Sequence, residues 1–145
     1  MSLETDIAIL GGGPVGAGLA LALRESSHRV TLLESREAGT TDARPIAVSQ
    51  GSRELLTRLG AWPAGATPIQ EIHVSQRGGF GRVHISAREL QLPALGYIAE
   101  YAALAGALEH AAASTPARHL HPAHALGVHR DGADRKSTRL NSSHR

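Results

Sequence analysis

Residues 6–34, DIAILGGGPVGAGLALALRESSHRVTLLE, decide the fold of this chain. They begin with a short apolar run, Ile7–Leu10, of the kind found in a strand that is buried on both faces of a parallel sheet. A glycine-rich turn follows, then a helix of small residues predicted from about Val15 to Ser26, and a second apolar strand over Val30–Leu33. Glu34 comes directly after that strand. This order of strand, glycine turn, helix, strand and acid is typical of a βαβ unit that binds a dinucleotide.

The glycines and the acid have separate mechanical roles in such a unit. Gly11 permits the tight turn, Gly13 lets the backbone approach a pyrophosphate, and Gly16 lets the helix lie close against the strand. The helix then directs its unbonded N–H groups and the positive end of its dipole at the phosphates. Glu34, twenty-three residues after Gly11, offers a carboxylate to the two ribose hydroxyls. The predicted contacts with an adenine dinucleotide are Gly11, Gly13, Pro14, Val15, Gly16 and Glu34.

The C-terminal residues indicate a different origin from the rest of the chain. Over eleven residues, Asp134–His144 (DRKSTRLNSSH) is similar to the conceptual translation of a common sequencing-library adapter. Such a segment is excluded before the fold is considered; the alternative is a natural basic tail that binds nucleic acid. We expect residues 1–133 to be the N-terminal part of the genuine domain and residues 134–145 to be a non-native tail.

Charge and composition exclude several classes of protein. The formal net charge is +2, but the tail carries four basic residues and one acid, so the remainder has a charge of about −1. With only four aromatic residues as well, nothing indicates a nucleic-acid surface. The absence of cysteine excludes disulfides and thiolate metal sites, and it fits a reducing cytoplasm.

The remaining segments predict the elements around the βαβ unit. A polar connector lies between Glu34 and Ala47, a helix over Ser49–Leu59 ends at Gly60, and Trp62–Pro68 is a loop. Strands over Ile69–Ser75 and Val83–Ser86 form a hairpin in which Ile72 and Val74 are matched by Val83 and Ile85. A helix is predicted over Tyr101–Ala113, and a further strand within His119–Val128. The predicted fold class is α/β: a Rossmann-like βαβ core with an inserted β-hairpin, truncated before the rest of the domain.

Other candidate sites have weaker support. Arg44 lies on a loop near the carboxyl ends of the strands, where it could bind a pyrophosphate, although composition alone favours a solvated arginine there. Arg36 is interpreted as a surface residue. His119, His121 and His124 have no carboxylate nearby before Asp131, so no metal site is predicted. The uncharged stretch of residues 7–23 lacks the basic flank of a signal peptide and is broken by glycines, which argues against a membrane span.

Several segments together resemble one family, over about Asp6–Ala113. Besides the glycine turn and Glu34, they are Asp42–Ser49 (DARPIAVS), Gly51-Ser52, Leu59–Trp62 (LGAW), Pro68–Ser75 (PIQEIHVS), Gly79–Gly81 and Ala94–Ile98. The chain is similar in them to the ubiquinone-biosynthesis flavin hydroxylases, the 2-polyprenyl-6-methoxyphenol hydroxylase group. These are class A flavoprotein monooxygenases with a fold like that of para-hydroxybenzoate hydroxylase.

The resemblance implies FAD as the dinucleotide, with Arg44 at its phosphates. It also implies NAD(P)H as the reductant, O2 as co-substrate and a polyprenyl phenol as the molecule hydroxylated, in the cytoplasm or at the inner face of the membrane. Because the chemistry belongs to the cofactor, no catalytic side chain is predicted. Many members carry an arginine where this chain has Ala102, which leaves that FAD contact open. Two alternatives stay open: another two-dinucleotide flavoprotein oxidoreductase, and an inactive fragment. Association with a membrane or a biosynthetic complex is also open.

Overall fold

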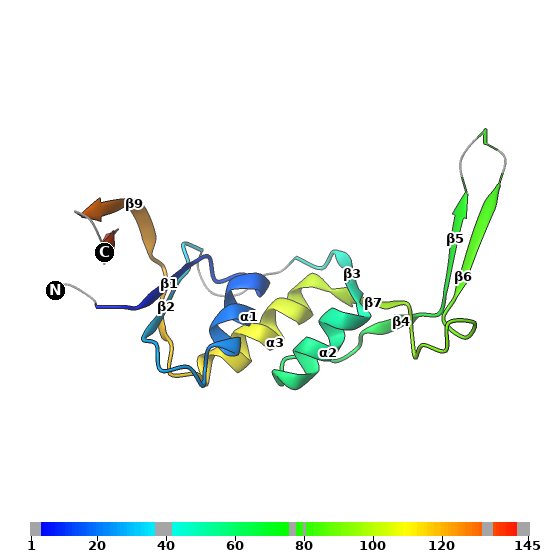
Figure 1. The fold of residues 1–145 in the computed structure, drawn as a ribbon, viewed down its shortest axis with the longest axis horizontal. Coiled ribbons are helices and arrows are strands. Elements are labelled where there is room, and N and C mark those ends of the chain that lie inside the picture. The colour runs from blue at the N-terminus through cyan, green and yellow to red at the C-terminus, as the bar shows by residue number, and fades with distance from the viewer. Residues whose placement is uncertain (1–3, 37–41, 76–77, 80, 132–134, 142–145) are drawn as a thin grey trace. The chain divides into compact units, whose positions relative to one another are not determined.

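The computed structural model describes residues 4–36, 42–75, 78–79, 81–131 and 135–141 of the chain (Figure 1). The chain divides into two compact units. The first unit consists of residues 1–40 and 105–145, and the second of residues 41–104. Each unit is described by itself.

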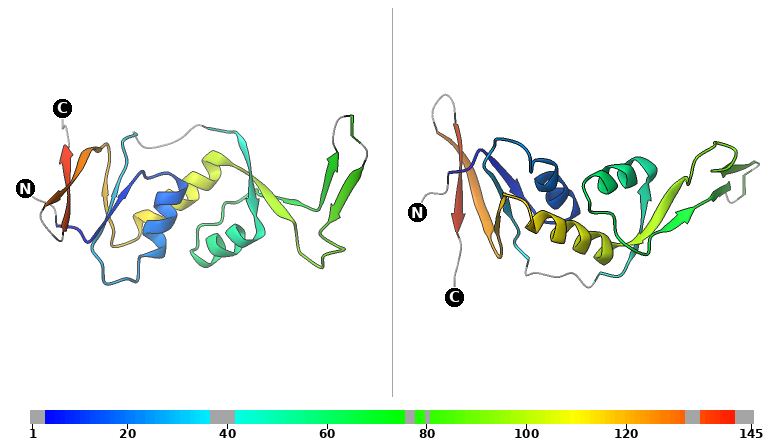
Figure 2. Two further views of the ribbon diagram at one scale, coloured as in Figure 1. Left: turned by 45° about the horizontal axis from the view of Figure 1, so that its top comes forward. Right: turned by 90° about the horizontal axis from the view of Figure 1, so that it is seen from below.

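A parallel three-stranded sheet organises the first unit. Its strands are β1 (Ile7–Leu10), β2 (Val30–Leu33) and β8 (Arg118–Leu120), in the order β1–β2–β8. Helix α1 (Pro14–Ala22) joins β1 to β2, so the predicted βαβ unit is confirmed (Figure 2). The helix ends four residues before the predicted Ser26. The second unit and helix α3 are inserted between β2 and β8, which confirms an α/β core with an insertion.

The centre of this sheet is β2, and the burial of the strands follows from that position. All four residues of β2 are buried, because β1 pairs with one side of it and β8 with the other. In β1 only Ile9 is buried, and Leu10 is 53% exposed. The expectation that β1 is buried on both faces is therefore wrong for the described residues, since β1 is the edge strand of this sheet. The core cluster consists of Ile9, Ala20, Val30 and Leu32.

Helix α3 (Tyr101–Ala113) has the predicted bounds, and its predicted apolar stripe, Leu104 and Leu108, is buried. Within the first unit Leu108 packs beside Gly18 of α1, where an added Cβ would lie 3.7 Å from Leu108 Cδ2. The single strand predicted within His119–Val128 is instead two strands, β8 and β9 (His124–Asp131). Pro122 lies between them and has no N–H with which to continue a ladder.

Strand β10 (Arg135–Asn141) runs antiparallel to β9, from Arg135↔Asp131 to Asn141↔His124. It occupies most of the segment that the sequence predicts to be non-native, while residues 134 and 142–145 lie outside the described part. The foreign origin of this segment stays a prediction.

An antiparallel sheet and a hairpin form the second unit. The sheet consists of β3 (Pro45–Ser49), β7 (Gly96–Glu100) and β4 (Thr67–Ile69), in the order β3–β7–β4. Neither β3 nor β7 is predicted from the sequence, and Pro68 lies in β4 instead of a loop. Proline is tolerated there because β4 is an edge strand. Helix α2 (Gln50–Arg58) begins as predicted, with the Ser49 hydroxyl accepting the Ser52 N–H at 3.1 Å.

The hairpin of the second unit consists of β5 (Glu71–Ser75) and β6 (Arg82–Ser86), visible in green in Figure 1. Its register pairs Ile72 with Ile85 and Val74 with Val83, as the sequence predicts. Residues 76, 77 and 80 of the predicted connection, and residues 37–41 of the polar connector, lie outside the described part of the chain.

Candidate functional site

The glycine loop of the first unit leaves the carboxyl end of β1 and enters α1. Gly11 has a φ of +106°, which side chains rarely adopt, and its N–H donates to the Leu33 carbonyl at 2.8 Å. A Cβ on Gly16 would overlap the carbonyl oxygen of Gly11 and lie 3.3 Å from Ile9 Cγ2. The close approach of helix and strand that the sequence predicts at Gly16 is therefore present, and it allows no side chain there.

The N-terminus of α1 can accept an anion. Gly13 is the N-cap residue, in extended conformation, and α1 has no side-chain cap. Pro14 follows at the first helical position, and Val15 is 87% exposed. The first N–H groups of a helix have no partner within the helix, and the helix dipole favours negative charge beside them. A phosphate can therefore bind here without displacing a side chain.

Glu34 holds its carboxylate beside this loop. Its Oε2 accepts the Gly12 N–H at 2.8 Å, and its main chain is bonded on the other side to Leu120 and Ala123. The Arg36 guanidinium donates to both carboxylate oxygens, at 3.2 and 3.0 Å, and the Arg36 N–H donates at 2.9 Å. These bonds, the Arg36 side chain first, lower the pKa of Glu34 from 4.5 to about 2. Glu34 is thus ionised at neutral pH and accepts hydrogen bonds only.

Two residues of this arrangement are not among the predicted site residues. Gly12 links the loop to Glu34 through its N–H, and Arg36, interpreted as a surface residue, contacts the carboxylate. A run of three glycines offers a signal for Gly12, because any N–H of such a loop can turn toward an acid. The spacing of Glu34 and Arg36 carries no comparable signal, since the contact depends on how the chain leaves β2.

Arg44 lies in the second unit, immediately before β3. Its Nε forms an ion pair with Asp42 Oδ2 at 3.0 Å, and its guanidinium carbon lies 4.8 Å from the centroid of the Tyr101 ring. The main chains join as well, since the Tyr101 N–H donates to the Arg44 carbonyl and the Ala102 N–H to that of Asp42. The side chain remains 65% exposed. Asp42 and Tyr101 therefore orient a guanidinium that still faces solvent.

The structure brings the predicted residues of the first unit together: the loop from Gly11 to Gly16 and the Glu34 carboxylate lie at the carboxyl ends of β1 and β2. Of the histidines considered for metal binding, His119 lies in β8 and His124 in β9. They do not belong to a cluster of three ligands in the described residues, but Glu71, His73 and His84 do. Among the residues described, no helix is both long and apolar enough to cross a bilayer.

The parallel sheet, the tight glycine loop and the acid after β2 define a dinucleotide-binding α/β domain. The chain belongs to the FAD binding domain family, whose sequence pattern matches residues 4–144. FAD is therefore the dinucleotide of this family, as the resemblance implies.

Named relatives confirm the resemblance to ubiquinone-biosynthesis hydroxylases. The 3-demethoxyubiquinol 3-hydroxylase of Escherichia coli (strain K12) is 36% identical over 138 residues, covering 87% of this chain and 35% of that protein. The ubiquinone hydroxylase UbiL of Rhodospirillum rubrum is 32% identical over 103 residues, covering 66% of this chain and 24% of that protein. The chain thus spans about a third or less of the length of these relatives.

Solved structures of flavin enzymes share the fold. The flavin-dependent monooxygenase PieE superposes with a TM-score of 0.74 at 18% identity, covering 96% of this chain and 27% of PieE. The p-nitrophenol 4-monooxygenase PnpA of Pseudomonas putida gives 0.73 at 18% identity, covering 97% of this chain and 37% of PnpA. At this identity the likeness establishes the FAD-binding fold alone.

Proposed function

We propose that the chain is the FAD-binding N-terminal portion of an NAD(P)H- and O2-dependent hydroxylase that acts on a polyprenyl phenol in ubiquinone biosynthesis. Membership of the FAD binding domain family and similarity to two ubiquinone-pathway hydroxylases support this function. Because the chain spans about a third of such a relative, the reaction is assigned to the complete protein.

The position of the Glu34 carboxylate is the observation that carries the proposal. It lies at the end of β2 and is bonded to the Gly12 N–H, where a ribose next to a loop-bound pyrophosphate needs an acceptor. The donor set fits FAD: an uncapped helix N-terminus for the phosphates and an ionised acid for the ribose. The residues proposed to hold the cofactor are Gly11, Gly13, Pro14, Val15, Gly16 and Glu34, with Gly12 added from the structure.

Arg44 is proposed to contact the FAD phosphates. A guanidinium presents five N–H donors, and the Arg44 side chain remains 65% exposed beside its ion pair with Asp42. A cation–π contact, with the guanidinium carbon 4.8 Å from the centroid of the Tyr101 ring, restricts the side chain, which reduces the entropy lost on binding an anion. The contact with Tyr101 thus supports Arg44 as a phosphate contact in a chain that has Ala102 where many family members have an arginine.

Bound FAD supplies the redox chemistry, accepting reducing equivalents from NAD(P)H and making O2 reactive toward a phenolic ring. The residues of this chain bind and orient the cofactor. A polyprenyl phenol partitions into lipid, since each buried CH2 favours transfer by about 0.8 kcal/mol. We therefore place the complete protein in the cytoplasm, acting at the inner face of the membrane.

The origin of residues 134–145 is part of the proposal, because a non-native tail means that the natural reading frame continues differently after about Ala133. The family match extends to residue 144, so the question needs a direct test. Sequencing the locus from intact source DNA, without adapter chemistry, should show a frame that departs from Asp134–His144. Finding the same eleven residues there would make this part of the proposal wrong.

The complete protein tests the function itself. Purified protein should be yellow and release FAD on heat denaturation. With NADH or NADPH and a polyprenyl phenol it should consume O2 and place an atom of isotopically labelled O2 on the ring. Reductant consumption that continues without O2 would favour another two-dinucleotide oxidoreductase, and protein without bound FAD would contradict the proposal at its base.

A further inference from the structure

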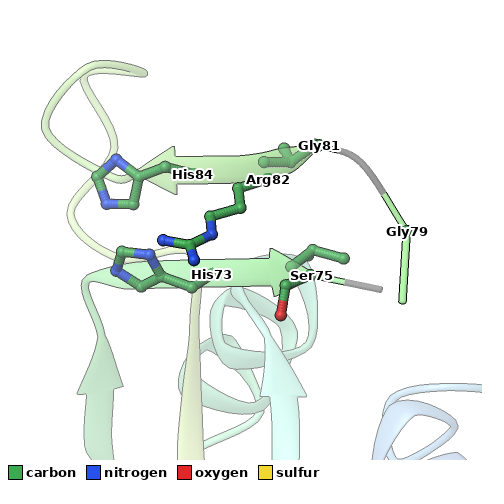
Figure 3. A pocket seen from close by; sticks show the side chains of 8 residues that line it. His73, Ser75, Gly79, Gly81, Arg82 and His84 are labelled. Carbon is green, nitrogen blue, oxygen red and sulfur yellow. The ribbon is translucent and has the colours of Figure 1, made fainter. Parts of the chain in front are cut away.

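The hairpin of the second unit carries three potential metal ligands on one face. His73 of β5 and His84 of β6 are directly opposite each other in the register. Glu71 precedes His73 by two residues, and alternate residues of a strand point to the same face. Figure 3 shows His73 and His84 side by side on the two strands. None of the three is among the residues proposed to hold FAD.

The ligand atoms of these side chains converge. Glu71 Oε2 lies 3.8 Å from His73 Nε2 and 3.6 Å from His84 Nε2. One ligand atom from each residue falls within 4.8 Å of the other two. The centroids of the two imidazole rings are 4.4 Å apart and the ring planes are tilted by 31°, and the Nε2 atom of each ring is the one that approaches Glu71.

This spacing is close to what a metal ion needs. Zn–N and Zn–O bonds of about 2.0–2.1 Å at tetrahedral angles place ligand atoms about 3.3 Å apart. The observed separations exceed that value by a few tenths of an ångström for the two Glu71 contacts. All three side chains are largely solvent-exposed, so small rotations can close the gap. The backbone register already places His73 and His84 directly opposite each other, so only side-chain rotations are needed to form the site.

We propose that Glu71, His73 and His84 bind one divalent transition-metal ion, Zn²⁺ by the chemistry of the ligands, with water at the fourth position. Two imidazoles and one carboxylate are a ligand set that zinc accepts, and exposure of the site leaves room for the water. The ion would join β5 to β6. A two-stranded hairpin is marginally stable alone, so a ligand bound only by the paired strands stabilises them by mass action.

Arg82 is the charged group that argues for a different occupant. It lies next along the same face, opposite Ser75, and with two imidazoles it suits an anion (Figure 3). Glu71 decides between the two, because its Oε2 lies within 3.8 Å of both imidazole Nε2 atoms. An anion held by the imidazoles would be repelled by this carboxylate, whereas a cation would be attracted to it. The site therefore favours a cation.

Zinc titration of the metal-free complete protein, in competition with a chromophoric chelator at neutral pH, tests the proposal. One Zn²⁺ should bind per chain at micromolar concentration. Loss of a group that only hydrogen-bonds a metal ligand weakens metal binding about 10–100-fold. Loss of a ligand itself, in His73→Gln or His84→Gln, should therefore weaken zinc binding at least about tenfold. His110→Gln, at an exposed histidine of α3, is the matched control and should change nothing. Arg82→Gln should leave zinc affinity intact or raise it.

Cobalt provides a measurement that does not depend on the variants. Co²⁺ added to the unaltered chain should give the intense visible bands of four- or five-coordination, and Zn²⁺ should remove them. The proposal is overturned if no Zn²⁺ binds at micromolar concentration, or if His73→Gln and His84→Gln bind it as well as the unaltered chain. It is also overturned if Co²⁺ keeps the weak spectrum of the hydrated ion. If the unaltered chain binds inorganic phosphate instead of Zn²⁺, and Arg82→Gln loses that phosphate binding, the cluster is an anion site.

Discussion

Replacing Glu34 by alanine in the complete protein should weaken FAD binding and leave the fold in place. Four N–H groups donate to the Glu34 carboxylate in the structure: that of Gly12 and three of Arg36. A carboxylate has about four acceptor positions, so ribose hydroxyls must displace guanidinium bonds to be accepted. The Arg36 side chain is 62% exposed, and an ion pair of that kind is worth only about 0–1 kcal/mol. Replacing the Arg36 hydrogen bonds by bonds from the ribose hydroxyls therefore costs little free energy, and the hydroxyls then donate to a charged carboxylate.

The magnitude follows from the bonds gained and lost. A hydrogen bond to a charged group contributes about 1.5–3 kcal/mol, and subtracting the displaced ion pair, about 0–1 kcal/mol, leaves a loss of about 0.5–3 kcal/mol for Glu34→Ala. At about 1.4 kcal/mol per factor of ten, the Kd for FAD should rise about 2–150-fold. Quenching of flavin fluorescence during titration of the apoprotein measures this Kd directly.

Two further variants separate the ribose contact from general effects. Glu34→Gln keeps an acceptor of the same size without the charge and should lose less affinity than Glu34→Ala. Glu25→Ala removes an acid of the same unit whose side chain is 86% exposed, and it should bind FAD like the unaltered protein. If Glu34→Ala keeps the original Kd, or if Glu25→Ala loses as much, Glu34 is not the ribose acceptor.

Two other predictions follow from the same region of the first unit. Gly16→Ala should abolish FAD binding, because its Cβ would overlap the Gly11 carbonyl oxygen and displace the loop; Gly106→Ala, at a helix glycine with open space around it, should retain FAD. Absorbance of the purified variants checks this, and flavin retained by Gly16→Ala would refute the assigned packing. The depressed pKa of Glu34 stabilises the fold fully above the unfolded value of 4.5, and this contribution disappears as pH falls toward about 2. Its size, reduced for solvent screening at Arg36, should be about 1–2 kcal/mol, and Arg36→Gln should lose less stability than the unaltered chain between pH 5 and 3 in urea unfolding. Parallel pH curves for the two would contradict this cause of the shift.

Local patterns in the sequence determine much of the fold. The apolar runs Ile7–Leu10 and Val30–Leu33 form β1 and β2, as short apolar runs bounded by turn residues predict, although only β2 is buried along its whole length. The Tyr101–Ala113 helix has the bounds that its alanine and leucine content predicts. The hairpin pairs Ile72 with Ile85 because the period of two allows one register that matches the apolar side chains. In each case neighbouring residues carry the whole signal.

Only the tertiary structure decides how distant segments meet. Strand β3 is not predicted because its partner β7 is about fifty residues away in the sequence. Pairing over that distance produces no recognisable pattern in Pro45–Ser49 itself. The burial of β2 and the exposure of Leu10 depend on which strands lie beside each, and β8 arrives only after the whole second unit. The bond between Gly12 and Glu34 likewise forms because parallel pairing of β1 with β2 places their carboxyl ends together. Sequence supplies the residue types of the site, and long-range backbone pairing sets their distances.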